Sequence, residues 1–227
     1  MNSVVIVFPG SNCDKDVYNS INEVTGKKPK LIWYKDEIPR NSDLIILPGG
    51  FSFGDYLRCG AIASKSSILH QIKDFIKKNT PILGICNGFQ ILIEAGFLPG
   101  MLLMNKSLKF ICKSVNLVVS NNNTRFTKNF KHNEIVSMPV AHKVGNYFIP
   151  KKGLEKLILN DQILFRYSDI EGSYNEDNNP NGSINNIAGV MNEKGNVLGM
   201  MPHPERVYGN NKDLNMKKII MSLCNEK

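Results

Sequence analysis

The alternation of short apolar runs with amphipathic stretches over the first 95 residues constrains the fold most strongly. Four apolar runs predict buried strands, at residues 3–8, 30–34, 43–47 and 81–85. Apolar residues at helical spacing predict three helices, at residues 14–24, 66–78 and 88–95. Strands that alternate with helices predict an α/β fold, with a doubly wound, mostly parallel sheet flanked by helices.

The second half of the chain predicts an additional β-rich region. Strand patterns without long helices between them occupy residues 110–119, 134–140, 147–149 and 162–167. A polar loop over 175–186 precedes a predicted hairpin of residues 187–191 and 196–201, and a closing helix is expected over 212–224. Because no repeat or linker interrupts the chain, we expect a single domain over residues 1–227.

The composition argues against several classes of protein. Lys and Arg number 28 against 20 Asp and Glu, a net charge of +8, but 23 of the 28 are Lys and they are spread along the chain. A nucleic-acid site would cluster Arg and aromatic residues, so no nucleic-acid partner is expected. No run approaches the ~18 apolar residues of a membrane helix, and no signal-peptide pattern opens the chain, so we expect a cytoplasmic protein.

The cysteines suggest neither a disulfide framework nor a metal site. There are five, an odd number, and no Cys-x-x-Cys pair occurs. We therefore expect no metal in this chain, and most of the cysteines are expected to be small buried hydrophobes.

One cysteine differs from the others because of its neighbours. Cys86 stands between a predicted buried strand and a predicted helix, with Gly84 and Gly88 two residues away on either side. This has the form of a nucleophile elbow, in which small flanking residues allow a sharp turn. The positive end of the helix would favour the reactive thiolate, and the N–H of Asn87 would face a developing oxyanion. A buried structural cysteine is the alternative.

A cysteine nucleophile needs a base, and the base needs a group that orients it. The chain has four histidines, and His203 is the strongest candidate. It follows a predicted strand, prolines flank it, and Glu205 stands two residues on, where its carboxylate could hold the imidazole. His142 also follows a predicted strand and could line a site, while a solvated loop histidine is the alternative for His203.

A double-glycine loop follows the third predicted strand. Gly49 and Gly50 would let a backbone N–H face the reacting carbonyl, at the edge of the sheet where active-site loops gather. No Gly-x-x-x-x-Gly-Lys-[Ser/Thr] phosphate-binding pattern occurs, so we do not expect this chain to use ATP itself.

Together these elements resemble the class I (triad) glutamine amidotransferases, and within them the glutaminase subunits that serve purine biosynthesis. The resemblance runs from about residue 4 to about residue 208. Five motifs in order carry it: residues 9–14 (PGSNCD), 48–58 (PGGFSFGDYLR), 84–90 (GICNGFQ), 179–183 (NPNGS) and 199–206 (GMMPHPER).

The resemblance implies a catalytic triad. Cys86 would attack the side-chain amide of glutamine and form a thioester. His203 would take the thiol proton and pass it to the leaving ammonia, and Glu205 would orient His203.

The resemblance also implies the rest of the site and its partners. The N–H groups of Gly50 and Asn87 would hold the oxyanion, and Gln90 and His142 would help to bind glutamine. No cofactor is expected in this chain. Ammonia would pass to a synthetase subunit that uses ATP and Mg²⁺, and a small third subunit would bridge the two.

One segment departs from the family pattern. Ala141 and His142 are followed by Lys143, Val144 and Gly145, where the family usually has Gly-Glu-Gly. A non-catalytic scaffold subunit of the same kind of complex therefore stays open, as does a glutaminase that serves a different synthetase. A cysteine peptidase or chaperone-like protein with the same elbow is a further alternative, but such proteins lack the element that carries Glu205.

Overall fold

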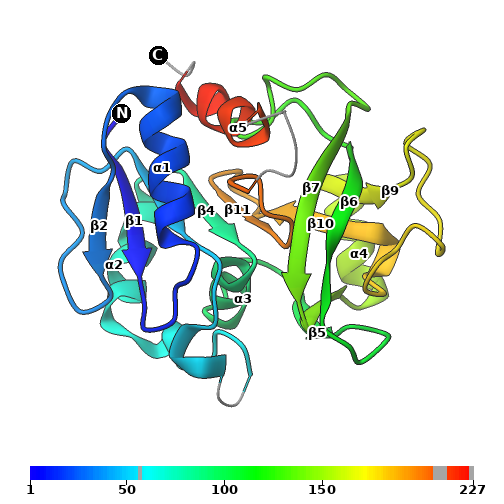
Figure 1. Ribbon diagram of the computed structural model, residues 1–227, viewed down its shortest axis with the longest axis horizontal. Coiled ribbons are helices and arrows are strands. Elements are labelled where there is room, and N and C mark those ends of the chain that lie inside the picture. The colour runs from blue at the N-terminus through cyan, green and yellow to red at the C-terminus, as the bar shows by residue number, and fades with distance from the viewer. Residues whose placement is uncertain (56–57, 207–213, 225–227) are drawn as a thin grey trace.

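The structure is a computed structural model that describes residues 1–55, 58–206 and 214–224 (Figure 1). Strands and helices alternate through its first half. In chain order these are β1 (Ser3–Val7), α1 (Asp14–Thr25), β2 (Lys30–Trp33), β3 (Leu44–Leu47), α2 (Ser67–Lys77), β4 (Ile82–Ile85) and α3 (Asn87–Glu94), with 3₁₀ turns at Ser52–Asp55 and Ala63–Lys65. Every element predicted there is present, within one residue at each end.

The second half is rich in strands, as predicted, but contains two elements that the sequence did not suggest. It comprises β5 (Met101–Met104), β6 (Ile111–Val119), β7 (Ile135–His142), β8 (Val144–Phe148), α4 (Lys151–Leu159), β9 (Ile163–Ser168), β10 (Ile187–Met191), β11 (Val197–Met200) and α5 (Leu214–Cys224), with a 3₁₀ turn at Ile184–Asn186. The unpredicted elements are β5 and α4, and β8 begins three residues earlier than expected. The first two residues of the predicted closing helix, 212 and 213, lie outside the described residues.

A mixed nine-stranded sheet forms the centre of the molecule, in the order β2-β1-β3-β4-β11-β10-β9-β6-β7. The five strands from β2 to β11 are parallel, and β10, β9, β6 and β7 continue the sheet antiparallel. The α/β prediction with a β-rich addition is confirmed. The last parallel strand, β11, arrives through the predicted hairpin with β10, so the C-terminal half completes the parallel part.

The order of the strands determines where the helices lie. The chain runs from β1 to β2 in one direction along the sheet and from β3 to β4 in the opposite direction. Because such crossovers are right-handed, α1 and α2 cover opposite faces. Helix α1 packs on β1 and on the C-terminal helix α5, and α3 packs on β3, β4 and β11 (Figure 1).

Apolar side chains on both faces of the parallel strands build the core. Every residue of β3 and of β4 is buried, which is what a near-continuous apolar run between two helical layers predicts. The parallel strands also bring their carboxyl ends to one edge of the sheet. The loops after β1, β3, β4 and β11 therefore meet there, beside the switch in strand order between β1 and β3.

A two-stranded antiparallel sheet of β5 and β8 lies outside the main sheet. Among the described residues, no helix is both long enough and apolar enough to cross a membrane.

Candidate active site

Cys86 occupies a strained turn between β4 and α3. Its φ of 49° and ψ of −103° lie in a region that non-glycine residues rarely adopt. Two hydrogen bonds fix the turn: the Cys86 N–H donates to the carbonyl of Met200 (2.8 Å), and its carbonyl accepts from the N–H of Gln90 (3.1 Å). Strain of this kind, held by surrounding bonds, is a recurrent feature of functional sites.

The flanking glycines are required by close packing, as the predicted elbow demands. A Cβ atom on Gly88 would lie 1.9 Å from the carbonyl oxygen of Leu47, and one on Gly84 would lie 2.5 Å from the side chain of Leu92. Helix α3 therefore lies directly against the strands. The turn places the Cys86 thiol at the N-terminus of α3, where helix N–H groups lack intrahelical acceptors and the dipole favours a negative charge.

His203 and Glu205 form a buried pair just after β11. The Nδ1 atom of His203 lies 2.7 Å from Oε1 of Glu205, and both side chains are almost completely inaccessible to solvent. The N–H of His203 donates to the carbonyl of Pro139 (2.9 Å), so β7, the last strand of the antiparallel extension, holds the loop in place. A carboxylate on Nδ1 leaves Nε2 as the nitrogen that can exchange a proton with a nucleophile.

Electrostatic interactions couple the pair of His203 and Glu205 to Cys86. Burial lowers the pKa of His203, but the carboxylate of Glu205 and the negative charge of a Cys86 thiolate outweigh burial and hold that pKa well above its usual value. Cys86 is thus close enough to the imidazole for its charge to matter. The structure brings together the three predicted triad residues, which lie 119 positions apart in the sequence, from Cys86 to Glu205.

The predicted oxyanion residues lie in two loops that contact each other. Gly50 has φ of 150°, and a Cβ there would lie 2.3 Å from the carbonyl oxygen of Gly10. Asn87 opens α3, and its side chain accepts from the N–H of Ser52 (3.1 Å). The double-glycine loop is therefore bound to the first turn of α3. The role of the Gly50 and Asn87 N–H groups as oxyanion donors stays a prediction.

Gln90 connects α3 to β8, the strand that follows β7 after a single residue. Its Nε2 donates to the carbonyl of Val144 (2.7 Å), and its Oε1 accepts from the side chain of Asn87 (2.8 Å). Both ends of the Gln90 side chain are occupied by protein groups, which indicates that it shapes the pocket wall. The carbonyl of Ala141, near the end of β7, lies 3.7 Å from the Cys86 sulfur.

His142 is buried behind this wall. Asn105 donates through its amide nitrogen to the carbonyls of Lys109 and His142, so its Oδ1 accepts from Nδ1 of His142 at 3.1 Å. Burial, with a smaller contribution from the charge of His203, lowers the pKa of His142 to about 4. The ring is therefore neutral at physiological pH. The part of His142 in binding glutamine stays a prediction.

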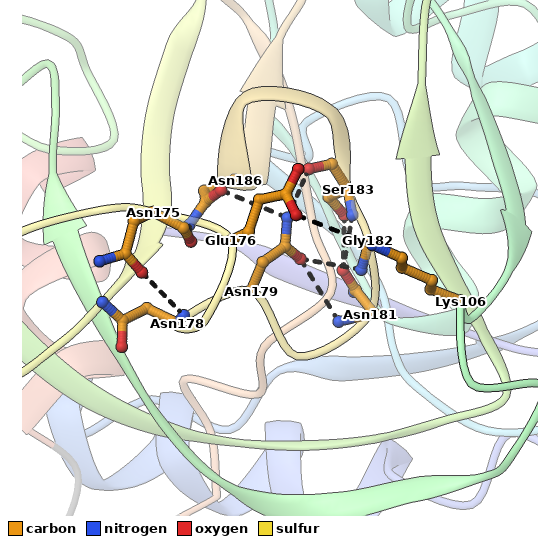
Figure 2. A network of polar contacts seen from close by, with 9 residues as sticks. All are labelled: Lys106, Asn175, Glu176, Asn178, Asn179, Asn181, Gly182, Ser183 and Asn186. Atoms are coloured by element: carbon orange, nitrogen blue, oxygen red, sulfur yellow. Dashed lines mark hydrogen bonds and ion pairs between the residues drawn. The ribbon is translucent and has the colours of Figure 1, made fainter.

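Polar contacts among its own residues hold the asparagine-rich loop over 175–186 together, as Figure 2 shows. Within the loop, the Asn179 side chain accepts from the N–H of Gly182 (2.8 Å) and donates to the carbonyl of Ser183 (2.7 Å). From the loop, the Asn181 side chain donates to the carbonyl of Gly145 in β8 (2.8 Å). The motif at residues 179–183 thus positions the strand whose carbonyl holds Gln90.

A cavity of about 300 Å³ opens beside Gln90 and Val144. An ion pair lies at its wall, in which Nε and Nη2 of Arg58 bind the two carboxylate oxygens of Glu94 at 2.9 and 2.7 Å. Cys59 also lines it, and burial together with Asp55 raises the pKa of that thiol to about 12. The described residues that line this cavity do not include Cys86, His203 or Glu205, so the cavity lies beside Gln90 and not at the Cys86 thiol itself.

Sequence reasoning missed Cys13, which lies against the base. Its sulfur, a ring nitrogen of His203 and a carboxylate oxygen of Glu205 all lie within 4.8 Å of one another, and all three residues are buried. The sequence feature that could have identified Cys13 is its position in the motif at residues 9–14, directly after β1. A cysteine there reads as an ordinary buried hydrophobe until the position of β11 is known.

Comparison with known proteins agrees with this geometry. The family model described as a CobB/CobQ-like glutamine amidotransferase domain matches residues 1–220. Phosphoribosylformylglycinamidine synthase subunit PurQ of Aquifex aeolicus is 50% identical over 206 residues, which are 91% of this chain and 91% of that protein. PurQ of Chlorobium luteolum is also 50% identical, over 202 residues that cover 89% of this chain and 87% of that protein.

The fold also matches that of a solved structure. A chain in the structure of PurLQS from Thermotoga maritima superposes with a TM-score of 0.85 at 43% identity, covering 99% of this chain and 97% of that one. The chain therefore belongs to the family of CobB/CobQ-like glutamine amidotransferase domains, and its relatives there are PurQ subunits of phosphoribosylformylglycinamidine synthase.

Proposed function

We propose that the chain is the glutaminase subunit of phosphoribosylformylglycinamidine synthase. It hydrolyses glutamine to glutamate and ammonia and passes the ammonia to a synthetase subunit, which uses ATP and Mg²⁺ to convert formylglycinamide ribonucleotide into its amidine. The buried pair of His203 and Glu205 beside the Cys86 elbow carries the proposal. The identity of about 50% to PurQ subunits over most of the chain supports the choice of synthetase.

In the proposed reaction each residue of the site takes one step. His203 takes the thiol proton through Nε2, and the Cys86 thiolate attacks the side-chain carbonyl carbon of glutamine. The N–H groups of Gly50 and Asn87 stabilise the oxyanion. His203 returns the proton to the leaving ammonia, and a γ-glutamyl thioester remains on Cys86. Water activated by His203 then attacks the thioester and releases glutamate and the free thiol.

Glu205 works throughout by holding the tautomer of His203 and by stabilising the imidazolium. The electrostatic coupling favours a charged imidazolium beside a thiolate, which is the reactive state of a cysteine and histidine pair. The mechanism needs no cofactor from this chain.

The departure at Lys143 and Val144 is compatible with catalysis. Both residues make hydrogen bonds here through the backbone: the Lys143 carbonyl accepts from the N–H of Asn105 (2.9 Å), and the Val144 carbonyl accepts from Gln90. Any residue supplies a carbonyl, so the two replacements keep these contacts. We therefore favour the enzyme over the scaffold subunit.

The partners follow from the same relatives. We propose that the chain assembles with a synthetase subunit and a small subunit, as the name of the PurLQS complex indicates for the similar chain. We also propose that it works in the cytoplasm, because all five cysteines are free thiols, the usual state in a reducing compartment.

Glutamate release from glutamine tests the proposal. The purified chain is assayed with and without its synthetase complex, as wild type, Cys86→Ala and the control Cys112→Ala, which removes an exposed thiol of β6. We expect release that needs Cys86 and rises when the synthetase is loaded. A folded chain in a competent complex that releases no glutamate would support the scaffold, and release unaffected by this synthetase would support a different one.

A further inference from the structure

A second thiol, that of Cys13, lies beside the His203 and Glu205 pair of the candidate active site. Cys13 is buried, and its N–H donates to the carbonyl of Gly49 (3.1 Å), while its carbonyl accepts from Val17 in α1 (3.1 Å). A Cβ on Gly49 would lie 3.0 Å from the Cys13 sulfur and 2.6 Å from Cε1 of His203. The thiol is therefore held on the same side of Gly49 as the imidazole by the backbone around it.

Two buried polar atoms in this cluster have no hydrogen-bond partner among the described residues. They are Nε2 of His203 and Oε2 of Glu205. Leaving such groups unpaired costs free energy unless a ligand or water reaches them. The triad mechanism uses Nε2 but gives Oε2 no task. Both residues that join Cys13 in the cluster therefore carry a buried polar atom without a protein partner.

The donor set selects a class of ligand. Cysteine sulfur, histidine nitrogen and carboxylate oxygen are the groups that bind Zn²⁺, whereas Mg²⁺ and Ca²⁺ require oxygen ligands throughout. Bonds of about 2.0–2.3 Å hold the ligand atoms of a tetrahedral zinc ion roughly 3.3–3.8 Å apart. The three donor atoms already lie within 4.8 Å of one another, so side-chain movements are enough to close the site.

We propose that Cys13, His203 and Glu205 form a site for one Zn²⁺ ion that inhibits the enzyme. Binding exchanges the thiol proton of Cys13 for a zinc–sulfur bond and releases that proton to water, while the imidazolium of His203 gives one proton to the Cys86 thiolate and so frees a ring nitrogen for the ion. The ion engages a nitrogen of His203 and so removes the base from the catalytic cycle. Cys86 is not a ligand and keeps its thiol free. The binding stands on the geometry alone, while the inhibition rests on the proposed function.

Cobalt provides the binding test, because Co²⁺ accepts the same ligands and reports a bound thiolate by a charge-transfer band in the near ultraviolet. The full chain is titrated with Co²⁺, then with Zn²⁺ in competition, as wild type, Cys13→Ser, Cys86→Ala and the control Cys112→Ala. We expect one equivalent with the band in wild type, Cys86→Ala and Cys112→Ala. In Cys13→Ser the band should disappear and the Zn²⁺ affinity should fall at least tenfold.

Two results would overturn the site. One is a band that survives Cys13→Ser and vanishes in Cys86→Ala, since the ion would then sit on the nucleophile. The other is the absence of any one-equivalent thiolate band in wild type. If Cys13→Ser does not fold, as circular dichroism would show, Cys13→Ala replaces it with the same expectations.

The inhibition is measured separately, as the fold-loss of glutamate release at saturating Zn²⁺ in the loaded complex. Each variant is compared with its own zinc-free rate, and a chelator is added at the end. We expect reversible inhibition of wild type and at least tenfold less sensitivity in Cys13→Ser. Equal sensitivity in both would refute the regulatory role. A chain that binds Co²⁺ through Cys13 but never releases glutamate would leave the site standing and remove the proposed function.

Discussion

Acid should destabilise the protein through His142. The ring is buried and neutral, and burial lowers its pKa from 6.5 to about 4. In the unfolded chain it binds a proton below about pH 6.5, while the folded chain binds one only near pH 4. The contribution of this group to the free energy of unfolding is therefore fully present above about pH 6.5 and is lost as the pH falls towards 4. At pH 4.5 the loss amounts to roughly 2.5 kcal/mol.

The variant His142→Asn isolates this effect. Its amide nitrogen can replace Nδ1 as the donor to Asn105, so it keeps the hydrogen bond and removes the titrating group. The free energy of unfolding is measured by urea titration at pH 7 and pH 4.5. We expect the fall between the two pH values to be smaller in the variant than in wild type by roughly 2.5 kcal/mol.

The control is His132→Asn, which removes an exposed histidine from the loop before β7. It should show the same fall as wild type. Equal falls in wild type and His142→Asn would refute the reasoning, because they would mean that the buried ring takes up its proton without loss of stability.

Three further outcomes are expected. Glu205→Gln should lower glutamate release by the loaded complex roughly 10²- to 10⁴-fold, since Gln can offer His203 the wrong hydrogen-bonding group, and an unchanged rate would remove Glu205 from the triad. Gly88→Ala should cost about 2 kcal/mol or more in urea unfolding, because its Cβ would lie 1.9 Å from a carbonyl oxygen; Gly96→Ala, whose Cβ meets nothing within 4 Å, should cost only about 1 kcal/mol. Tyr147→Phe should lower the free energy of unfolding by about 1 kcal/mol, because it removes the hydrogen bond from the Tyr147 hydroxyl to the carbonyl of Pro99 (2.8 Å). An unchanged free energy of unfolding would indicate that water replaces this bond.

The parallel half of the sheet could be predicted because each strand is a continuous apolar run. Residues 44–47 and 82–85 are buried on both faces, so their pattern depends on nothing outside the segment itself. The elbow follows from the same logic. The glycines at 84 and 88 signal close backbone approach, and the structure supplies the reason in the carbonyl of Leu47 and the side chain of Leu92.

The two missed elements depend on contacts that a local pattern does not contain. Strand β5 is apolar but largely exposed, with Met101 at 44% and Met104 at 45%, and it exists because β8 pairs with it. Helix α4 buries only Leu157 and carries Gly153 within its first turn, so its apolar face is weak. Neither segment has the strong periodicity that identified the other elements.

In the candidate site too, the residues in local motifs could be predicted, and the contact that depends on the fold could not. The predicted triad residues could be singled out from the sequence, because each stands in a short motif whose chemistry is local: a cysteine between glycines, and a histidine two residues from a glutamate. Cys13 could not be assigned a neighbour, because its distance to His203 depends on the order in which β1, β3, β4 and β11 are arranged. What sequence reasoning lacks here is the arrangement of loops around one edge of a sheet.

That arrangement also explains why one edge holds both the candidate nucleophile, Cys86, and a second thiol, Cys13. Parallel strands deliver every connecting loop to the same side, so the loop after β1 is forced against the loops that carry Gly49 and His203. Gly49 has no side chain, and any Cβ there would displace the imidazole or the Cys13 sulfur. The glycine that leaves room for the imidazole of the predicted base therefore also leaves that imidazole beside a thiol, and the zinc site that we propose depends on this placement.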